Sequence, residues 1–174
     1  VELVNRSDEF SLLALQGPDA EKTISKITDA DLTIPFYWLT NGQVAGVDVM
    51  ISRTGYTGEP GFELCFQKEN SETVWNAIME AGQEFDIEPI GLGARDTLRL
   101  EMKYCLYGND IDQTTNPIEA GLGWITKVDK GDFIGKPTIV EAKEKGITRK
   151  LVGFEVEGKA FPRHGYKIFS GEEQ

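Results

Sequence analysis

Residues 52–66 read SRTGYTGEPGFELCF, and the rest of the chain can be understood outward from this stretch. Glycines recur at positions 55, 58 and 61, and an apolar run follows from Gly61 to Gln67. Glycine tolerates positive φ and lets another group approach the backbone closely, so the spacing predicts a tightly bent loop that leads into a β-strand. The residues alone leave two interpretations open: a plain hairpin connection, or a loop shaped for a ligand.

The predicted strand after this loop carries one acidic residue, Glu63. Strict alternation places Glu63 on the face opposite Phe62, Leu64 and Phe66. A carboxylate on such a face can accept two parallel hydrogen bonds, from an amino group and from the ring N–H beside it, as a 2-amino-oxopyrimidine edge offers them. The alternative is an exposed Glu on the polar side of a half-buried strand.

Upstream of the loop the pattern indicates one β-turn-α unit and several short strands. Phe10–Gln16 reads as a strand, and the Gly-Pro-Asp sequence at 17–19 ends it and begins a helix over 20–27. Further strands are predicted at 37–39, 43–47 and 49–52. Asn41-Gly42 between them is a strong signal for a type I′ hairpin turn.

Downstream, apolar residues at helical spacing predict helices over 70–84 and from Gly93 or Ala94 to Met102. The order β-α-β-β-α favours an α+β fold, a ferredoxin-like antiparallel sheet with helices on one face. Beyond residue 116 the sequence changes to turns and charged residues, with a helix predicted over 138–145. Strands predicted at 150–157 and 166–170 indicate a further β-rich unit.

Composition excludes several classes of function. The chain has 174 residues, with 18 Lys and Arg against 29 Asp and Glu, giving a net charge of −11. That charge argues against binding to nucleic acid or to an anionic membrane, and no apolar run approaches the roughly 20 residues of a membrane span. The cysteines Cys65 and Cys105 and the single His164 lack metal-ligand spacing, so no metal site and no His-based triad are predicted.

Three further residues are candidates for ligand binding. Arg95 lies near the start of a predicted helix, where its planar guanidinium can meet a carboxylate or a heterocyclic carbonyl. The alternative is that Arg95 and Arg99 pair with neighbouring acids such as Asp96. Tyr56 and Tyr104 could supply aromatic walls for a ring, although core packing would also explain them.

Three ordered motifs carry a resemblance to a known family: SRTGYTGEPGFEL at 52–64, GLGARDTLRLEMKYCLYGNDI at 91–111 and NPIEAGLGW at 116–124. They closely resemble the T-protein family, the aminomethyltransferases of the glycine cleavage system. The resemblance implies that residues 1–147 are the central part of a folate-binding region. It implies that residues 148–174 begin a C-terminal β-barrel domain.

The resemblance also implies a reaction. The lipoyl arm of H-protein brings an aminomethyl group, N5 of tetrahydrofolate takes the methylene, and ammonia leaves, giving 5,10-methylenetetrahydrofolate. Glu63 would bind the amino edge of the pterin, Arg95 would bond in the same pocket, and Tyr56 and Tyr104 would line it. The essential Asp of the family corresponds to a segment upstream of Val1. No catalytic residue is therefore assigned within the chain, and the chain alone is predicted to be inactive.

Related folate domains occur in sarcosine and dimethylglycine oxidases and in a family linked to iron–sulfur cluster assembly. A folate-binding module without transferase activity is therefore the alternative prediction. The T-protein resemblance predicts tetrahydrofolate and lipoylated H-protein as partners, without nucleic acid, membrane or metal. It places the protein in the bacterial cytoplasm or the mitochondrial matrix.

Overall fold

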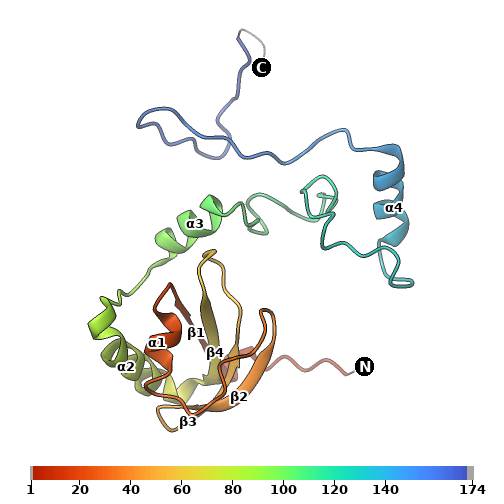
Figure 1. Cartoon of the computed structure of the whole chain (residues 1–174). Coiled ribbons are helices and arrows are strands. Elements are labelled where there is room, and N and C mark those ends of the chain that lie inside the picture. The colour runs from red at the N-terminus through yellow and green to blue at the C-terminus, as the bar shows by residue number, and fades with distance from the viewer. Residues whose placement is uncertain (1, 172–174) are drawn as a thin grey trace. The chain divides into compact units, whose positions relative to one another are not determined.

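The computed structural model describes residues 2–171 of the chain. These residues divide into two compact units, one ending at Cys105 and one beginning at Leu106, and each is considered by itself. The first unit holds nearly all of the regular structure (Figure 1). The helices and strands are β1 (Phe10–Gln16), α1 (Ala20–Ile24), β2 (Leu39–Val44), β3 (Val47–Ser52), β4 (Gly61–Gln67), α2 (Ser71–Gly82), α3 (Leu92–Glu101) and α4 (Lys136–Lys145).

The first unit is built on one four-stranded sheet in the order β1-β4-β3-β2, and all neighbouring strands run antiparallel. Strands β2, β3 and β4 thus form a meander, and β1 lies beside β4 at the edge of the sheet. Glu63 sits in an inner strand, opposite Ala14 of β1 and Ser52 of β3. The predicted α+β class, an antiparallel sheet with helices, is confirmed.

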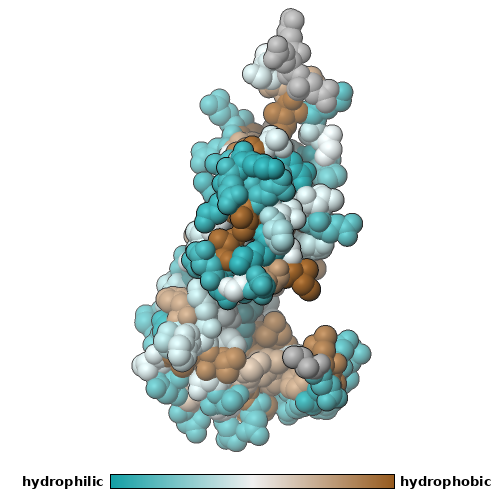
Figure 2. Space-filling view, turned by 90° about the vertical axis from the view of Figure 1, so that its right-hand side faces the viewer, coloured by the Kyte–Doolittle hydropathy of each residue, from teal (hydrophilic) through white to brown (hydrophobic). Residues whose placement is uncertain are grey.

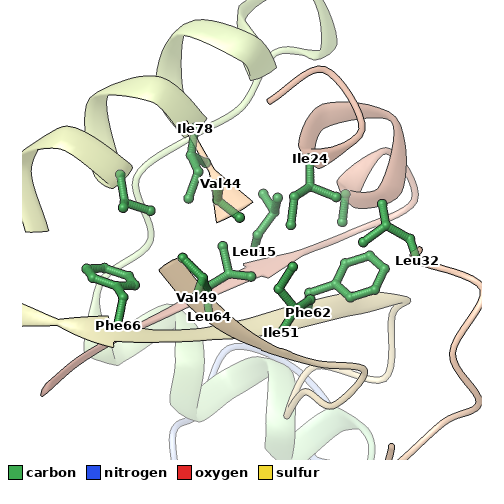
Figure 3. Packing of buried hydrophobic residues seen from close by; sticks show 12 residues of the cluster. Leu15, Ile24, Leu32, Val44, Val49, Ile51, Phe62, Leu64, Phe66 and Ile78 are labelled. Atoms are coloured by element: carbon green, nitrogen blue, oxygen red, sulfur yellow. The ribbon is translucent and has the colours of Figure 1, made fainter. Parts of the chain in front are cut away.

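One face of this sheet carries the hydrophobic core, and α1 and α2 cover it (Figure 3). In Figure 3, Ile24 of α1 and Ile78 of α2 point toward apolar side chains of the strands. The predicted alternation in β4 holds, because Phe62, Leu64 and Phe66 are buried while Glu63 is only half-buried. The buried cluster consists of Leu15, Ala20, Ile24, Leu32, Val44, Val49, Ile51, Phe62, Leu64, Phe66, Val74 and Ile78.

The predicted hairpin turn at Asn41-Gly42 is wrong. Both residues lie within β2, paired with Met50 and Val49, and the chain turns instead at Ala45-Gly46. These two residues have φ of 51° and 77°, the left-handed conformation that a two-residue type I′ turn requires. Gly42 serves a different need: a Cβ there would lie 2.5 Å from the Cβ of Ala30. Packing against a distant segment therefore explains this glycine.

Replacing Ala45 with Asn is expected to stabilise the first unit. The left-handed conformation is energetically unfavourable for Ala and less so for Asn, whose side chain can hydrogen-bond locally. Asn-Gly is also the preferred pair in type I′ turns. We expect the free energy of unfolding to rise by roughly 0.5–1 kcal/mol, measured by urea denaturation. An Ala14→Asn control in β1 should lower stability instead, because Asn is disfavoured in strands. A less stable Ala45→Asn variant would contradict the turn assignment.

The other face of the sheet is open within the first unit. It displays Leu12 and Met50, which are 60% and 38% exposed, with the half-buried Cys65 between them in the register. On the side of the molecule that Figure 2 shows, hydrophobic side chains lie at the surface among hydrophilic ones. Glu63 lies on this same face, two residues before Cys65 in β4. An acid thus sits at the edge of an apolar surface.

The second unit contains α4 and a series of turns. Arg149 joins the segment after α4 to the turns before it, because it donates hydrogen bonds to the carboxylate of Glu119 at 3.1 Å and to the carbonyl of Thr114 at 2.6 Å. In one exposed turn, the hydroxyl of Thr114 donates a hydrogen bond that lowers the pKa of Asp112.

The strands predicted at 150–157 and 166–170 do not form in the part of the chain that the structure describes. A strand needs a neighbouring strand for its N–H and C=O groups. These segments are exposed and make only isolated backbone contacts, such as the hydrogen bond from the N–H of Leu151 to the carbonyl of Glu119. The start of a C-terminal β-barrel therefore stays a prediction, as does the domain boundary after residue 147. No helix among residues 2–171 is long and apolar enough to cross a membrane.

Candidate functional site

The segment between β3 and β4, residues 53–60, is here called the glycine loop. Within it only Gly58 needs the left-handed conformation, with φ of 82°. A Cβ at Gly58 would also lie 2.5 Å from Cγ of Met102, which follows α3. The predicted tight bend is present, and it brings the tip of the loop against the end of a helix that lies far away in the sequence.

Glu63 faces the open side of the sheet and is half-buried. The hydroxyl of Thr54, at the start of the glycine loop, donates a hydrogen bond to Oε2 of Glu63. Among the described residues no hydrogen bond is made to Oε1, so that oxygen is available to a donor from a ligand. Thr54 thereby fixes the orientation of the carboxylate. The sequence does not predict this role for Thr54, because a Thr before a glycine is not a distinctive pattern.

Three of the predicted residues form a stack. The guanidinium carbon of Arg95 lies 4.9 Å from the centroid of the Tyr56 ring. The ring of Tyr56 in turn stacks with that of Tyr104, with centroids 5.7 Å apart and planes 21° apart. Arg95 uses its planar cation against an aromatic face, which is a favourable interaction for a guanidinium. The structure thus brings Tyr56 of the glycine loop together with two residues far along the sequence, Arg95 and Tyr104.

The segment after α3 is held in place by a buried arginine. Arg99 is 2% exposed, bonds Oδ1 of Asp96 through Nε at 2.9 Å and Nη2 at 2.7 Å, and donates from Nη1 to the carbonyl of Tyr104 at 3.1 Å. The hydroxyl of Tyr56 donates to the carbonyl of Cys105. The expected pairing with Asp96 is therefore made by Arg99. These bonds fix the position of Tyr104 against Tyr56.

The stack and the carboxylate are separate groups joined by the glycine loop. Glu63 bonds Thr54 rather than any member of the stack, and Tyr56 follows Thr54 by two residues. Together the two groups offer a hydrogen-bond acceptor, a planar cation and flat aromatic surfaces. Such a set suits a planar heterocycle with adjacent N–H donors. Among residues 2–171, no group of three His, Cys, Asp or Glu side chains is arranged to hold a metal ion.

This antiparallel α+β unit, with its glycine loop followed by a strand that bears Glu63, defines a known class of protein domain. Residues 1–130 match the family model described as the GCVT N-terminal domain, so the chain belongs to this family. The resemblance carried by the three sequence motifs is confirmed.

Individual relatives agree with this assignment. The chain is 53% identical over 174 residues to the aminomethyltransferase of Halothermothrix orenii, covering 99% of this chain and 49% of that protein. It is 59% identical over 169 residues to the aminomethyltransferase of Chloroherpeton thalassium, covering 97% of this chain and 46% of that protein. The chain thus spans about half the length of the curated relatives it matches.

A solved structure shows the same fold. The crystal structure of glycine cleavage system aminomethyltransferase T from Bartonella henselae superposes with a TM-score of 0.69 at 36% identity. The superposition covers 79% of this chain and 37% of that one. The family and the antiparallel sheet with its helices are therefore shown by both sequence and structure.

Proposed function

We propose that this chain forms the folate-binding part of an aminomethyltransferase that transfers a methylene group from aminomethyl-lipoyl H-protein to tetrahydrofolate. The observation that carries the proposal is the orientation of Glu63. Thr54 bonds Oε2 of the carboxylate. Since each carboxylate oxygen can accept two hydrogen bonds, Oε1 and Oε2 can still accept one N–H each from a ligand on the open side of the sheet. A carboxylate in that position suits the 2-amino group and adjacent ring N–H of a pterin. The names of the homologous aminomethyltransferases support the reaction class.

In this proposal the remaining residues complete the recognition of folate. Arg95 offers N–H donors to a carbonyl or a carboxylate, and Tyr56 and Tyr104 would line the pocket with their aromatic rings. The stack observed between these three side chains holds them in position before a ligand binds. Residues 1–147 would constitute the folate-binding region.

The reaction needs little covalent chemistry from the protein. N5 of tetrahydrofolate forms a bond to the methylene carbon, the carbon–nitrogen bond to the amino group breaks, and ammonia leaves. N10 then replaces the lipoyl sulfur on that carbon, giving 5,10-methylenetetrahydrofolate and the dihydrolipoyl arm. The residues described here would contribute by fixing the pterin so that N5 lies beside the incoming carbon and water is excluded.

The proposal is tested with the complete polypeptide that the gene encodes. Calorimetry should show binding of tetrahydrofolate, and incubation with aminomethylated, lipoylated H-protein should release ammonia and form 5,10-methylenetetrahydrofolate. Binding of folate without transfer would instead favour a folate-binding module, and absence of binding would contradict both functions. A location in the bacterial cytoplasm or the mitochondrial matrix stays a prediction.

The 174-residue chain alone is expected to be inactive in the same transfer assay. The reason is that the chain spans only about half the length of the aminomethyltransferases that it matches. A parallel assay of the complete encoded polypeptide provides the control. Formation of 5,10-methylenetetrahydrofolate by the isolated chain would show that these 174 residues hold all the groups that the reaction needs.

A further inference from the structure

Residues at the end of β1 form hydrogen bonds to both limbs of the glycine loop, which are the chain that enters the bend at Thr54 and the chain that leaves it from Pro60 to Phe62. The side-chain amide of Gln16 donates from Nε2 to the carbonyl of Thr54 and to that of Phe62, both at 3.2 Å. The next residue, Gly17, donates its backbone N–H to the carbonyl of Pro60 at 2.8 Å. One short stretch of chain therefore bonds the residues on either side of the bend.

The carboxamide also accepts a hydrogen bond from within the loop. The hydroxyl of Thr57 lies 3.5 Å from Oε1 of Gln16, and the same hydroxyl accepts the backbone N–H of Glu59 at 3.2 Å. Gln16 thus uses both its donor and its acceptor group on the glycine loop. Among the natural side chains of this length, only Gln supplies both, since Glu lacks the donor and Met lacks both.

Two of the three glycines in the loop motif make room for this carboxamide. A Cβ at Gly55 would lie 2.7 Å from Cδ of Gln16, and a Cβ at Gly61 would lie 2.6 Å from its Nε2. Neither glycine has a positive φ, so backbone conformation does not explain them. The side chain of Gln16 explains Gly55. A Cβ at Gly61 would also lie 2.5 Å from the backbone carbonyl oxygen of Leu15, so Gly61 makes room for both the backbone and the side chain at the end of β1.

The two limbs that Gln16 joins carry the candidate binding groups. Thr54, whose carbonyl Gln16 binds, orients Glu63 through its hydroxyl. Phe62, whose carbonyl Gln16 also binds, is the neighbour of Glu63 in β4. Tyr56 lies on the same loop, two residues after Thr54, and stacks with Arg95. A shift of the loop would therefore move both Thr54, which bonds the carboxylate of Glu63, and the ring of Tyr56.

We infer that Gln16 is a positioning residue for tetrahydrofolate, acting through the glycine loop on Glu63 and Tyr56. The inference rests on the proposed function. Gln16 itself need not touch the ligand, because its hydrogen bonds set the separation of the two limbs.

Two variants of the complete encoded polypeptide test this inference. Gln16→Glu keeps the shape of the side chain but loses both N–H donors, and Gln16→Met keeps the length but loses every hydrogen bond. We expect both to bind tetrahydrofolate about tenfold more weakly in calorimetry. Amide hydrogen exchange across residues 54–61 should become about tenfold faster, while exchange in the core of α2 should stay unchanged.

A core variant separates positioning from general loss of stability. Val74 is fully buried in α2, away from the glycine loop in the sequence and without a side-chain hydrogen bond. Val74→Ala should destabilise the fold but leave folate affinity and loop exchange as in the wild type. The inference is overturned if Val74→Ala weakens folate binding as much as Gln16→Met, or if both Gln16 variants bind folate like the wild type.

The exchange measurement also distinguishes the two proposals from each other. If the wild-type protein binds no tetrahydrofolate, the proposed function fails. The role of Gln16 in holding the glycine loop is then tested by amide hydrogen exchange alone. Faster exchange of residues 54–61 in Gln16→Met would still support the role of Gln16 in holding the loop. Unchanged exchange there would overturn that role whatever the ligand is.

Discussion

A Glu63→Gln variant of the complete encoded polypeptide is expected to bind tetrahydrofolate roughly 10- to 100-fold more weakly than the wild type, a loss of about 1.5–3 kcal/mol. The carboxylate would accept both N–H groups of the pterin edge, whereas the amide presents its own N–H₂ to one of those donors. The hydrogen bond from Thr54 occupies one oxygen, so the amide cannot turn without placing its N–H₂ beside that hydroxyl. One of the two contacts is therefore lost in either orientation.

The matched control for this change is Glu59→Gln in the glycine loop. Glu59 is exposed, and removing its charge alters the net charge by the same amount as the change at position 63. Calorimetry should therefore give wild-type affinity for Glu59→Gln. Equal affinities for the wild type and Glu63→Gln would show that Glu63 does not bind the pterin. Equal losses for the two variants would assign the effect to the overall charge.

The sheet and the position of Glu63 could be predicted because they depend on local pattern. Apolar residues alternate from Phe62 to Phe66, and this alternation fixes which face of β4 is buried. The predicted position of the hairpin turn was wrong because that turn depends on a contact outside the local sequence. Asn41-Gly42 is a strong local signal, but Gly42 is needed where β2 passes Ala30, and the turn forms at Ala45-Gly46. A contact with a distant segment overrides the local preference.

The site was predicted only in part. Arg95, Tyr56 and Tyr104 were selected, and the structure stacks them, although no residue pattern indicated that Arg95 would lie on the ring of Tyr56. Thr54 and Gln16 were missed because their roles come from hydrogen bonds across the sheet. The glycine spacing indicates only that some group approaches the backbone of the loop closely, and the structure identifies that group as Gln16 at Gly55 and as Gln16 and the carbonyl of Leu15 at Gly61.

The same substitution on the two faces of the sheet should change the free energy of unfolding by very different amounts. Leu64 is fully buried in β4, whereas Leu12 in β1 is 60% exposed. Leu64→Ala should lower the free energy of unfolding by about 2–5 kcal/mol, because it removes buried methyl groups and leaves a cavity. Leu12→Ala should change it by less than about 0.5 kcal/mol. Urea denaturation of the 174-residue chain measures both.

This pair of variants also tests the register on which the site depends. Leu12 pairs with Cys65 and Leu13 with Leu64, so a slip of one residue between β1 and β4 would change which of their side chains share a face. A large cost for Leu12→Ala in the isolated chain would mean that the open face is covered in solution. Glu63 lies on that face, so covering it would also remove the access that folate needs. A small cost leaves the carboxylate accessible from the side where Thr54 orients it.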